Sequence, residues 1–314
     1  MIQTVTLRSD RAYRRRMPPA PIGHLILAIP TIVRQSVSMA FQRRSRPRGT
    51  PPRWLVAASD IRVVDVTGDD DAQVRFDVPR LGDAAGELYD QGELFPARPD
   101  PDDTGFDLLG DVLRDVASRN EDSDRFDPQL LKGLTGLRRV VGAEAGQVLI
   151  SGRRYLPTSP AVVDRAVIDM AASLYAKTPS SQRVRVVGVL DTVRISTQTF
   201  GLKLEDGQEI RGVFPSEEFD QVVALFASKL PVVVRGKAIF RPSGQLLLVD
   251  ADDVGAAVSE TSIWSQVPRP HGDPIYTVSL RRRQGARSGL GAIIGRWPGD
   301  ETDEEVAEAL EALS

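Results

Sequence analysis

The chain has 314 residues, 41% of them hydrophobic, and a formal net charge of -3. This length allows two compact domains with extensions, and the near-neutral charge excludes a protein that is basic as a whole. No cysteine occurs, which excludes a disulfide framework and a thiolate metal site and is consistent with a reducing compartment. We therefore expect a cytoplasmic location.

The N-terminal residues 1–52 are rich in arginine and predict an arm, a helix and a linker. The first 20 residues predict a basic arm without a fold of its own. Apolar residues at helical spacing over residues 22–41 predict an amphipathic helix, and Pro30 and Arg34 within it argue against a membrane span. The Arg-, Pro- and Gly-rich residues 43–52 predict a linker.

Residues 53–180 predict an α+β domain. A turn at Thr67-Gly68-Asp69 between two apolar stretches indicates a β-hairpin. Later, apolar residues at helical spacing follow Thr104 and Pro160, each of which suits a helix start. The expected elements, in chain order, are strands at 54–66 and 73–78, helices at 104–120 and 128–140, a strand at 147–151 and a helix from Pro160.

An acidic loop precedes the helix expected at 104–120. Four carboxylates, Asp100, Asp102, Asp103 and Asp107, could in principle hold a divalent cation. The segment lacks the alternating ligands and the distal glutamate of an EF-hand loop. We therefore expect a solvated acidic loop with no bound metal.

Residues 181–258 predict a small barrel. Asp206-Gly207 is a two-residue hairpin signal between alternating apolar stretches, and Ser216 suits a helix start. The expected order is β-β-β-α-β-β, which matches an OB-like fold with its helix between the third and fourth strands. The expected strands are at 184–190, 199–204, 209–214, 231–240 and 245–249.

OB-folds often bind nucleic acid through a basic groove with exposed aromatic side chains. In this barrel acidic residues nearly cancel the basic ones, and the phenylalanines fall mostly at inward positions. Nucleic-acid binding and protein docking both remain open for it, because fold alone does not decide function.

An acidic amphipathic helix is expected at the C-terminal end. Thr302 and Glu305 have the spacing of a capping box. Val306, Leu310 and Leu313 then line one apolar face, while glutamates cover the remainder. So short a helix is marginally stable alone, which indicates that its apolar face is buried on this chain or on a partner.

The stretch IIGRWPGDETDEEVAEALEAL, residues 293–313, resembles the toxin-binding tail of bacterial antitoxins encoded beside PIN-domain ribonucleases. The resemblance covers less than a tenth of the chain, which is far longer than typical antitoxins of this kind. It implies that Trp297, beside Pro298, anchors the tail on the toxin and that Arg296 approaches the acidic metal site of the nuclease. Val306, Leu310 and Leu313 would fill a groove on that partner.

Residues 259–314 also hold a basic cluster before the tail, consisting of Arg281, Arg282, Arg283 and Arg287. Such clusters bind nucleic acid non-specifically, and a solvated linker is the other interpretation. Catalysis finds little support, because His24 and His271 have no second ligand or nucleophile at useful spacing. We expect neither a cofactor nor an enzymatic activity.

The leading hypothesis is an antitoxin-like binding protein whose tail captures and inhibits a PIN-domain toxin encoded nearby. The alternative is a nucleic-acid-binding regulator that uses the OB-like barrel and the arginine clusters, with the tail packed on its own domain. A metal-dependent enzyme based on the acidic loop is a third hypothesis.

Overall fold

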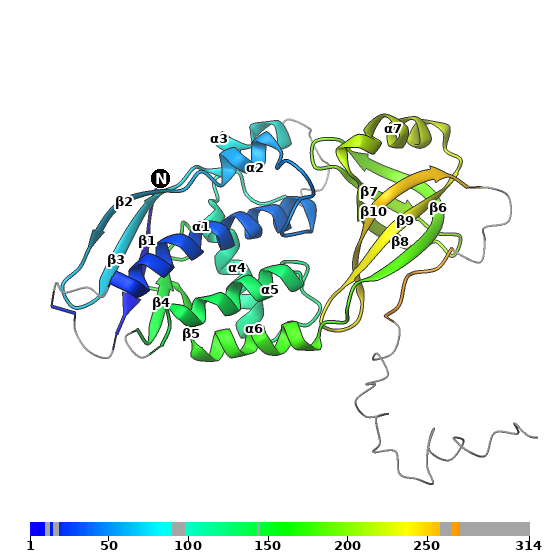
Figure 1. Ribbon diagram of the computed structural model, residues 1–314. Helices are drawn as coiled ribbons and strands as arrows, with labels where there is room; N and C mark the ends of the chain where they lie inside the picture. Colours follow the sequence, from blue (N-terminus) through cyan, green and yellow to red (C-terminus); the bar gives the residue numbers. More distant parts are fainter. Residues whose placement is uncertain (10–12, 15–18, 90–97, 143–144, 258–264, 271–314) are drawn as a thin grey trace, which may run out of the picture. The chain divides into compact units, whose positions relative to one another are not determined.

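The first β-sheet of the computed structural model is built around the N-terminal residues (Figure 1). The structure describes residues 1–9, 13–14, 19–89, 98–142, 145–257 and 265–270. Five antiparallel strands lie in the order β2-β3-β1-β4-β5. Their bounds are β1 Ile2–Arg8, β2 Arg62–Thr67, β3 Ala72–Asp77, β4 Gln147–Ile150 and β5 Ala161–Asp164.

The prediction of an N-terminal arm without a fold is wrong for residues 2–8, because β1 is the central strand of this sheet. Its alternate residues Val5 and Leu7 are fully buried. They lie opposite Val74 and Ala72 of β3, which are also fully buried. The alternation places one face of the strand in the core.

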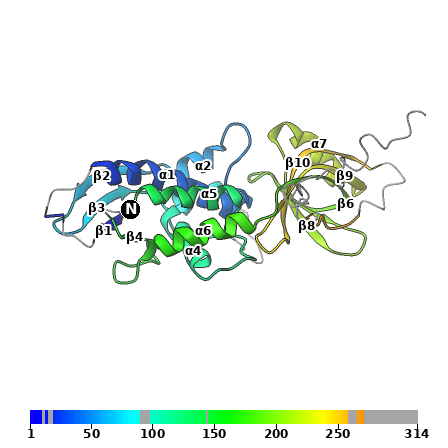
Figure 2. The same ribbon diagram turned by 60° about the horizontal axis from the view of Figure 1, so that its bottom comes forward.

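The helices form the other layer of this part. α1 (Pro19–Gln42) is the predicted amphipathic helix, and its apolar face is buried as expected. Figures 1 and 2 show α1, α5 and α6 lying side by side. The remaining bounds are α2 Arg53–Ala58, α3 Leu81–Ala84, α4 Gly105–Ala117, α5 Pro128–Thr135 and α6 Arg165–Lys177, with 3₁₀ turns at Gly86–Leu88 and Gly136–Arg139.

Glycine allows α1 and α4 to approach closely. A Cβ atom at Gly105 would lie 2.5 Å from a side-chain methyl of Val33. Val33 and Phe106 are both fully buried. Gly105 therefore fixes where α4 begins to pack on α1, and so it fixes the position of the side chains that follow.

Among the described residues, α1 is the one helix whose length and composition would allow it to cross a membrane. More than half of its apolar window is buried inside the protein. Its buried residues include Leu25, Ile29 and Val37.

Two segments differ from their predicted secondary structure. Trp54 lies in helix α2 and not in a strand, and its indole nitrogen donates to the carbonyl oxygen of Ser196 over 3.1 Å. The helix expected from Pro160 begins only at Arg165, where the Asp164 carboxylate accepts from the backbone nitrogen of Val167. The residues before it instead form β5, because pairing with β4 outweighs the local helix signal.

The second sheet is a closed barrel in the order β10-β8-β7-β6-β9, in which β10 and β8 are parallel. The five strands and the helix between the third and fourth confirm the predicted element order. Phe200 and Phe214 are buried in its core, as expected, and Phe240 is also buried. The bounds are β6 Gln182–Arg194, β7 Thr199–Lys203, β8 Glu209–Val213, α7 Phe219–Ser228, β9 Pro231–Phe240 and β10 Leu246–Ala256, with a 3₁₀ turn at Ser216–Glu218.

Specific contacts join the barrel to the helical layer, and residues 1–270 form one compact unit. The Gln42 side chain donates to the carbonyl oxygen of Thr197 over 3.1 Å, and both residues are buried. Arg44 forms an ion pair of 3.2 Å with Asp250. Leu248 of the barrel belongs to the same buried cluster as α1. The fold is thus mixed α/β, with two five-stranded sheets in one unit.

Candidate functional site

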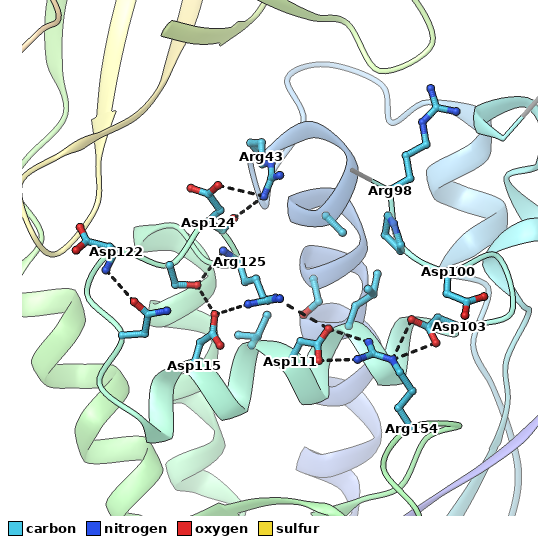
Figure 3. Close-up of a pocket in the computed structure, with 17 residues that line it drawn as sticks. Arg43, Arg98, Asp100, Asp103, Asp111, Asp115, Asp122, Asp124, Arg125 and Arg154 are labelled. Atoms are coloured by element: carbon cyan, nitrogen blue, oxygen red, sulfur yellow. Dashed lines mark hydrogen bonds and ion pairs between the residues drawn. The ribbon is translucent and has the colours of Figure 1, made fainter. Parts of the chain in front are cut away.

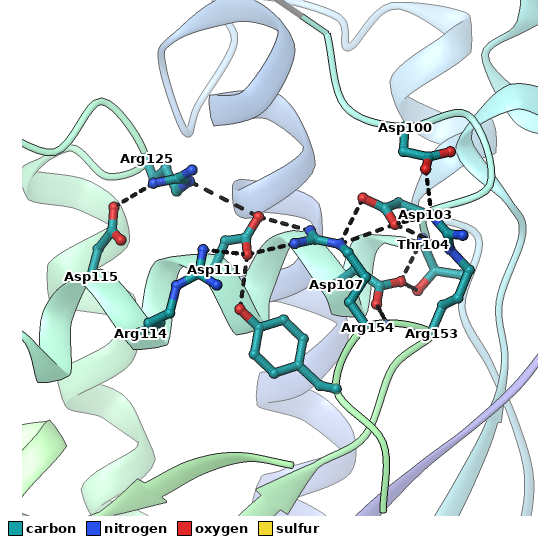
Figure 4. A network of polar contacts seen from close by, with 11 residues as sticks. Asp100, Asp103, Thr104, Asp107, Asp111, Arg114, Asp115, Arg125, Arg153 and Arg154 are labelled. Atoms are coloured by element: carbon teal, nitrogen blue, oxygen red, sulfur yellow. Dashed lines mark hydrogen bonds and ion pairs between the residues drawn. The ribbon is translucent and has the colours of Figure 1, made fainter. Parts of the chain in front are cut away.

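A row of aspartates follows one face of α4 (Figure 4). Asp107, Asp111 and Asp115 are spaced four residues apart on this helix, which places them above one another, and Asp103 continues the spacing one residue before the cap Thr104. All four are buried. The expectation of a solvated acidic loop is therefore wrong for Asp103 and Asp107.

Asp107 fixes the start of α4. One of its carboxylate oxygens accepts from the backbone nitrogen and the hydroxyl of Thr104, each over 2.8 Å. The other accepts from the backbone nitrogen of Arg154 over 2.7 Å. Asp107 therefore caps the helix and also ties the 152–155 segment to it.

Arg154 neutralises the middle of the row. Its two terminal nitrogens donate to the two oxygens of Asp111, each over 2.8 Å, and its Nε donates to Asp103 over 3.1 Å. Tyr155 adds a hydroxyl hydrogen bond of 2.8 Å to Asp111. This bidentate geometry is the strong form of an arginine–carboxylate pair.

The environments of these groups shift their pKa values in different directions. Burial raises the pKa of Asp103, and its pairing with Arg154 and Arg153 only partly offsets that effect. Burial would also raise the pKa of Asp111, but the hydrogen bonds from Arg154 and Tyr155 outweigh it, so that its pKa is lowered. Burial and the bond to Asp111 raise the pKa of the Tyr155 hydroxyl to about 12. Tyr155 is therefore neutral near pH 7.

Asp103, Asp111 and Asp115 of this row form one wall of a cleft of about 640 Å³ (Figure 3). Arg125 closes the far end, donating to Asp115 over 2.8 Å, and Ser123 donates to the same carboxylate over 2.6 Å. Six aspartates and four arginines line this cleft. The charged residues that line it are Arg43, Arg98, Asp100, Asp103, Asp111, Asp115, Asp122, Asp124, Arg125 and Arg154.

A second, smaller cleft of about 190 Å³ lies against β6, β7 and β8 of the barrel. Its lining differs in charge, because it holds four arginines and one glutamate, Glu209. The threonines 192, 197 and 199 add hydroxyl groups. The four arginines are Arg43, Arg98, Arg194 and Arg211, and the first two also line the larger cleft.

The chemistry of the two clefts suits ionic recognition. The carboxylates of Asp103, Asp111 and Asp115 are each paired with an arginine. A general base needs a carboxylate that can reach a substrate proton, and each of these carboxylates already accepts from an arginine. Among the described residues, no group of three or more His, Asp or Glu side chains is arranged to hold a metal ion.

The residues predicted from sequence as sites all lie outside the described residues, in 271–314. They are Arg281, Arg282, Arg283, Arg287, Arg296, Trp297, Pro298, Val306, Leu310 and Leu313. The acidic helix predicted from sequence at the C-terminal end falls in the same range and also lies outside the described residues.

The aspartate row and its arginines were not predicted as a site. The signal available in the sequence was the spacing of four between Asp103, Asp107, Asp111 and Asp115. It indicates one helix face, but not that Arg154 covers it.

Comparison with protein-family models, with curated proteins and with solved structures finds no match to this chain.

Proposed function

We propose that the chain is a non-enzymatic nucleic-acid-binding protein that holds phosphates in the arginine-lined cleft of an OB-like barrel. The observation that carries this is the lining of the smaller cleft, with four arginines against one glutamate. Arginine suits phosphate, since its planar guanidinium donates two parallel hydrogen bonds.

The barrel topology supports the OB-like assignment. The chain order β-β-β-α-β-β, the helix between β8 and β9, and the parallel pairing of β8 with β10 are as expected for such a barrel. The cleft lies against β7 and β8, the second and third strands, where OB-folds bind oligonucleotides.

The two aromatic residues of this cleft favour binding through phosphate contacts over binding through base stacking. Phe41 and Phe200 line it, but both are buried, so neither offers a face on which a base could stack. Contacts to phosphate hold the backbone without reading sequence. We therefore propose binding with weak sequence preference and strong dependence on salt.

Replacing Arg211 by alanine is expected to weaken binding to a fluorescein-labelled mixed-sequence single strand and to its duplex. Arg211 lines the cleft and its side chain is 60% exposed, so the change should not disturb folding. Loss of one phosphate contact should reduce the slope of log affinity against log salt by about 1. Fluorescence anisotropy at several salt concentrations measures both effects.

Arg165→Ala is the matched control, because Arg165 carries the same charge on α6 and is 90% exposed, away from the cleft. It should change affinity less than Arg211→Ala does. Equal effects of the two variants, or no binding by the unmodified chain, would contradict the proposal.

A second candidate function rests on the tail. We propose that residues 296–313 capture a PIN-domain toxin encoded nearby, as their resemblance to antitoxin tails implies. Trp297 would be the anchor, and aromatic anchors commonly contribute several kcal/mol to an interface, of the order of 2–4 kcal/mol.

Co-expression with the neighbouring gene product tests this second candidate. The full chain should retain that protein through purification and silence its ribonuclease activity, whereas a chain ending at Ser288 should do neither. Trp297→Ala should weaken the complex by at least about thirtyfold, as a loss of ~2 kcal/mol implies. If the full and the shortened chain retain the neighbouring protein equally, the tail does not bind it and this second proposal is wrong.

A further inference from the structure

Three arginines from distant parts of the chain converge on the carboxylate of Asp124. Arg241, after β9, donates to it from Nε over 3.2 Å and from Nη2 over 2.5 Å. Arg43, at the end of α1, and Arg211, in β8, approach its other oxygen at 3.6 and 3.9 Å. Only Arg241 is therefore at hydrogen-bond distance from the carboxylate.

The cluster carries more positive charge than Asp124 supplies in negative charge. Burial lowers the pKa of Arg43; Asp124 opposes this shift, and Arg211, Arg125 and Arg241 add to it. Arg43 also has φ of 59°, a left-handed conformation that favours glycine at the end of a helix. The Arg43 side chain also donates to the backbone carbonyl oxygen of Asp124 over 3.5 Å, but this contact leaves the net charge of the cluster positive.

A phosphate group matches the cluster better than a carboxylate does. It offers more oxygen acceptors and a larger negative charge, so it can accept from several guanidinium groups at once. Most of the cluster faces a cleft, since Asp124 lines the larger one, Arg211 the smaller one and Arg43 both, while Arg241 lines neither and is 17% exposed. Figure 3 shows Asp124 beside Arg43 at the cleft wall.

Neighbouring residues hold the loop that carries Asp124. The Ser123 hydroxyl donates to Asp115, and the Asp127 carboxylate accepts from the backbone nitrogen of Leu130 at the start of α5. Asp127 also accepts from the backbone nitrogen and hydroxyl of Ser45. The loop therefore keeps its anchors when the charge of Asp124 is removed.

We propose that Arg43, Arg211 and Arg241 form a phosphate subsite and that Asp124 occupies it in the absence of ligand, as an internal competitor. This inference rests on the proposed nucleic-acid function and names one site within it. A backbone phosphate entering the cleft displaces the Asp124 carboxylate and takes its three arginine partners. Binding of nucleic acid is thus weakened by a charge that the protein itself carries.

Asp124→Asn tests the inference, because it removes the competing charge and keeps the shape of the side chain. Binding of the labelled single strand should tighten by about threefold to tenfold, since a part-buried charge is removed from the subsite. Asp83→Asn is the matched control: it makes the same change of net charge at an exposed side chain of α3 that lines neither cleft. It should alter affinity by less than about twofold.

A second measurement uses inorganic phosphate alone. Phosphate should raise the thermal midpoint of Asp124→Asn more than that of the unmodified chain, relative to sodium chloride at equal ionic strength. Adding Arg211→Ala to Asp124→Asn should remove most of this gain. The thermal midpoints without phosphate show whether each variant is folded.

The outcomes separate this inference from the function on which it rests. Strand binding that Asp124→Asn and Asp83→Asn change equally would overturn the subsite and leave the nucleic-acid function standing. A phosphate response specific to Asp124→Asn, without strand binding by any variant, would support the subsite and overturn the nucleic-acid function. No response to either probe would overturn both.

Discussion

Replacing Asp107 by alanine is expected to lower the free energy of unfolding by about 3–4 kcal/mol, because a helix cap and a buried acceptor are lost together. Asp107 is fully buried, and its carboxylate accepts from the backbone nitrogens of Thr104 and Arg154. Alanine leaves both of these donors without an acceptor. Few single substitutions cost this much, and here the cost comes from the lost helix cap together with the two buried donors that lose their acceptor.

Urea unfolding followed by circular dichroism measures this loss. Asp102→Ala is the control, since Asp102 lies in the same loop with 61% of its side chain exposed and should change stability by less than about 0.5 kcal/mol. Asp107→Asn should be intermediate, because its amide oxygen still accepts one set of bonds. If Asp107→Ala and Asp102→Ala unfold at the same urea concentration, the capping and docking role assigned to Asp107 is wrong.

The elements that the sequence predicted well are those whose signal is local. The apolar stripe of α1 repeats at helical spacing, and Leu25, Ile29 and Val33 are all fully buried as that spacing requires. The barrel strands are bounded by turn residues, such as Gly207 with its φ of 83°. Both patterns lie within a few residues of the elements that they specify.

The central strand could not be predicted because its partners are distant. β1 pairs with β3 and β4, which lie about 70 and 140 residues further along the chain. Local composition around it, rich in arginine and proline, indicated disorder instead. Long-range pairing outweighed that composition.

The candidate site was missed for a related reason. Acidic residues on a helix face usually contact solvent, and here Arg153, Arg154 and Arg125 cover this face together with Tyr155 and Ser123. In the barrel, counting charges along the chain suggested that basic and acidic residues cancel. Folding instead brings Arg211 together with Arg43 from α1, which no count within the barrel could show.

Asp111 provides the prediction with the clearest dependence on pH. Its folded-state pKa is lowered, since hydrogen bonds from Arg154 and Tyr155 outweigh burial. Its stabilising contribution is therefore complete above the ordinary aspartate pKa of about 3.9 and is lost as the pH falls through the lowered folded value. Asp111→Asn should cost about 2 kcal/mol at pH 7, less than a fully buried pair would, because the Arg154 side chain is 34% exposed. The difference in free energy of unfolding between the variant and the unmodified chain should shrink as the pH falls below the ordinary aspartate pKa.

Asp103→Asn is the matched control for this pH dependence, because the shift at Asp103 has the opposite sign. Burial raises the folded-state pKa of Asp103, so its ionisation reduces stability as the pH rises through that value. Removing Asp103 should make the acid limb of the stability curve steeper, whereas removing Asp111 should make it shallower. Urea midpoints measured across the acid range for both variants give the two slopes. If both variants change the slope in the same direction, the opposite shifts assigned to these neighbouring carboxylates are wrong, and with them the view that Arg154 and Tyr155 specifically stabilise the charge on Asp111.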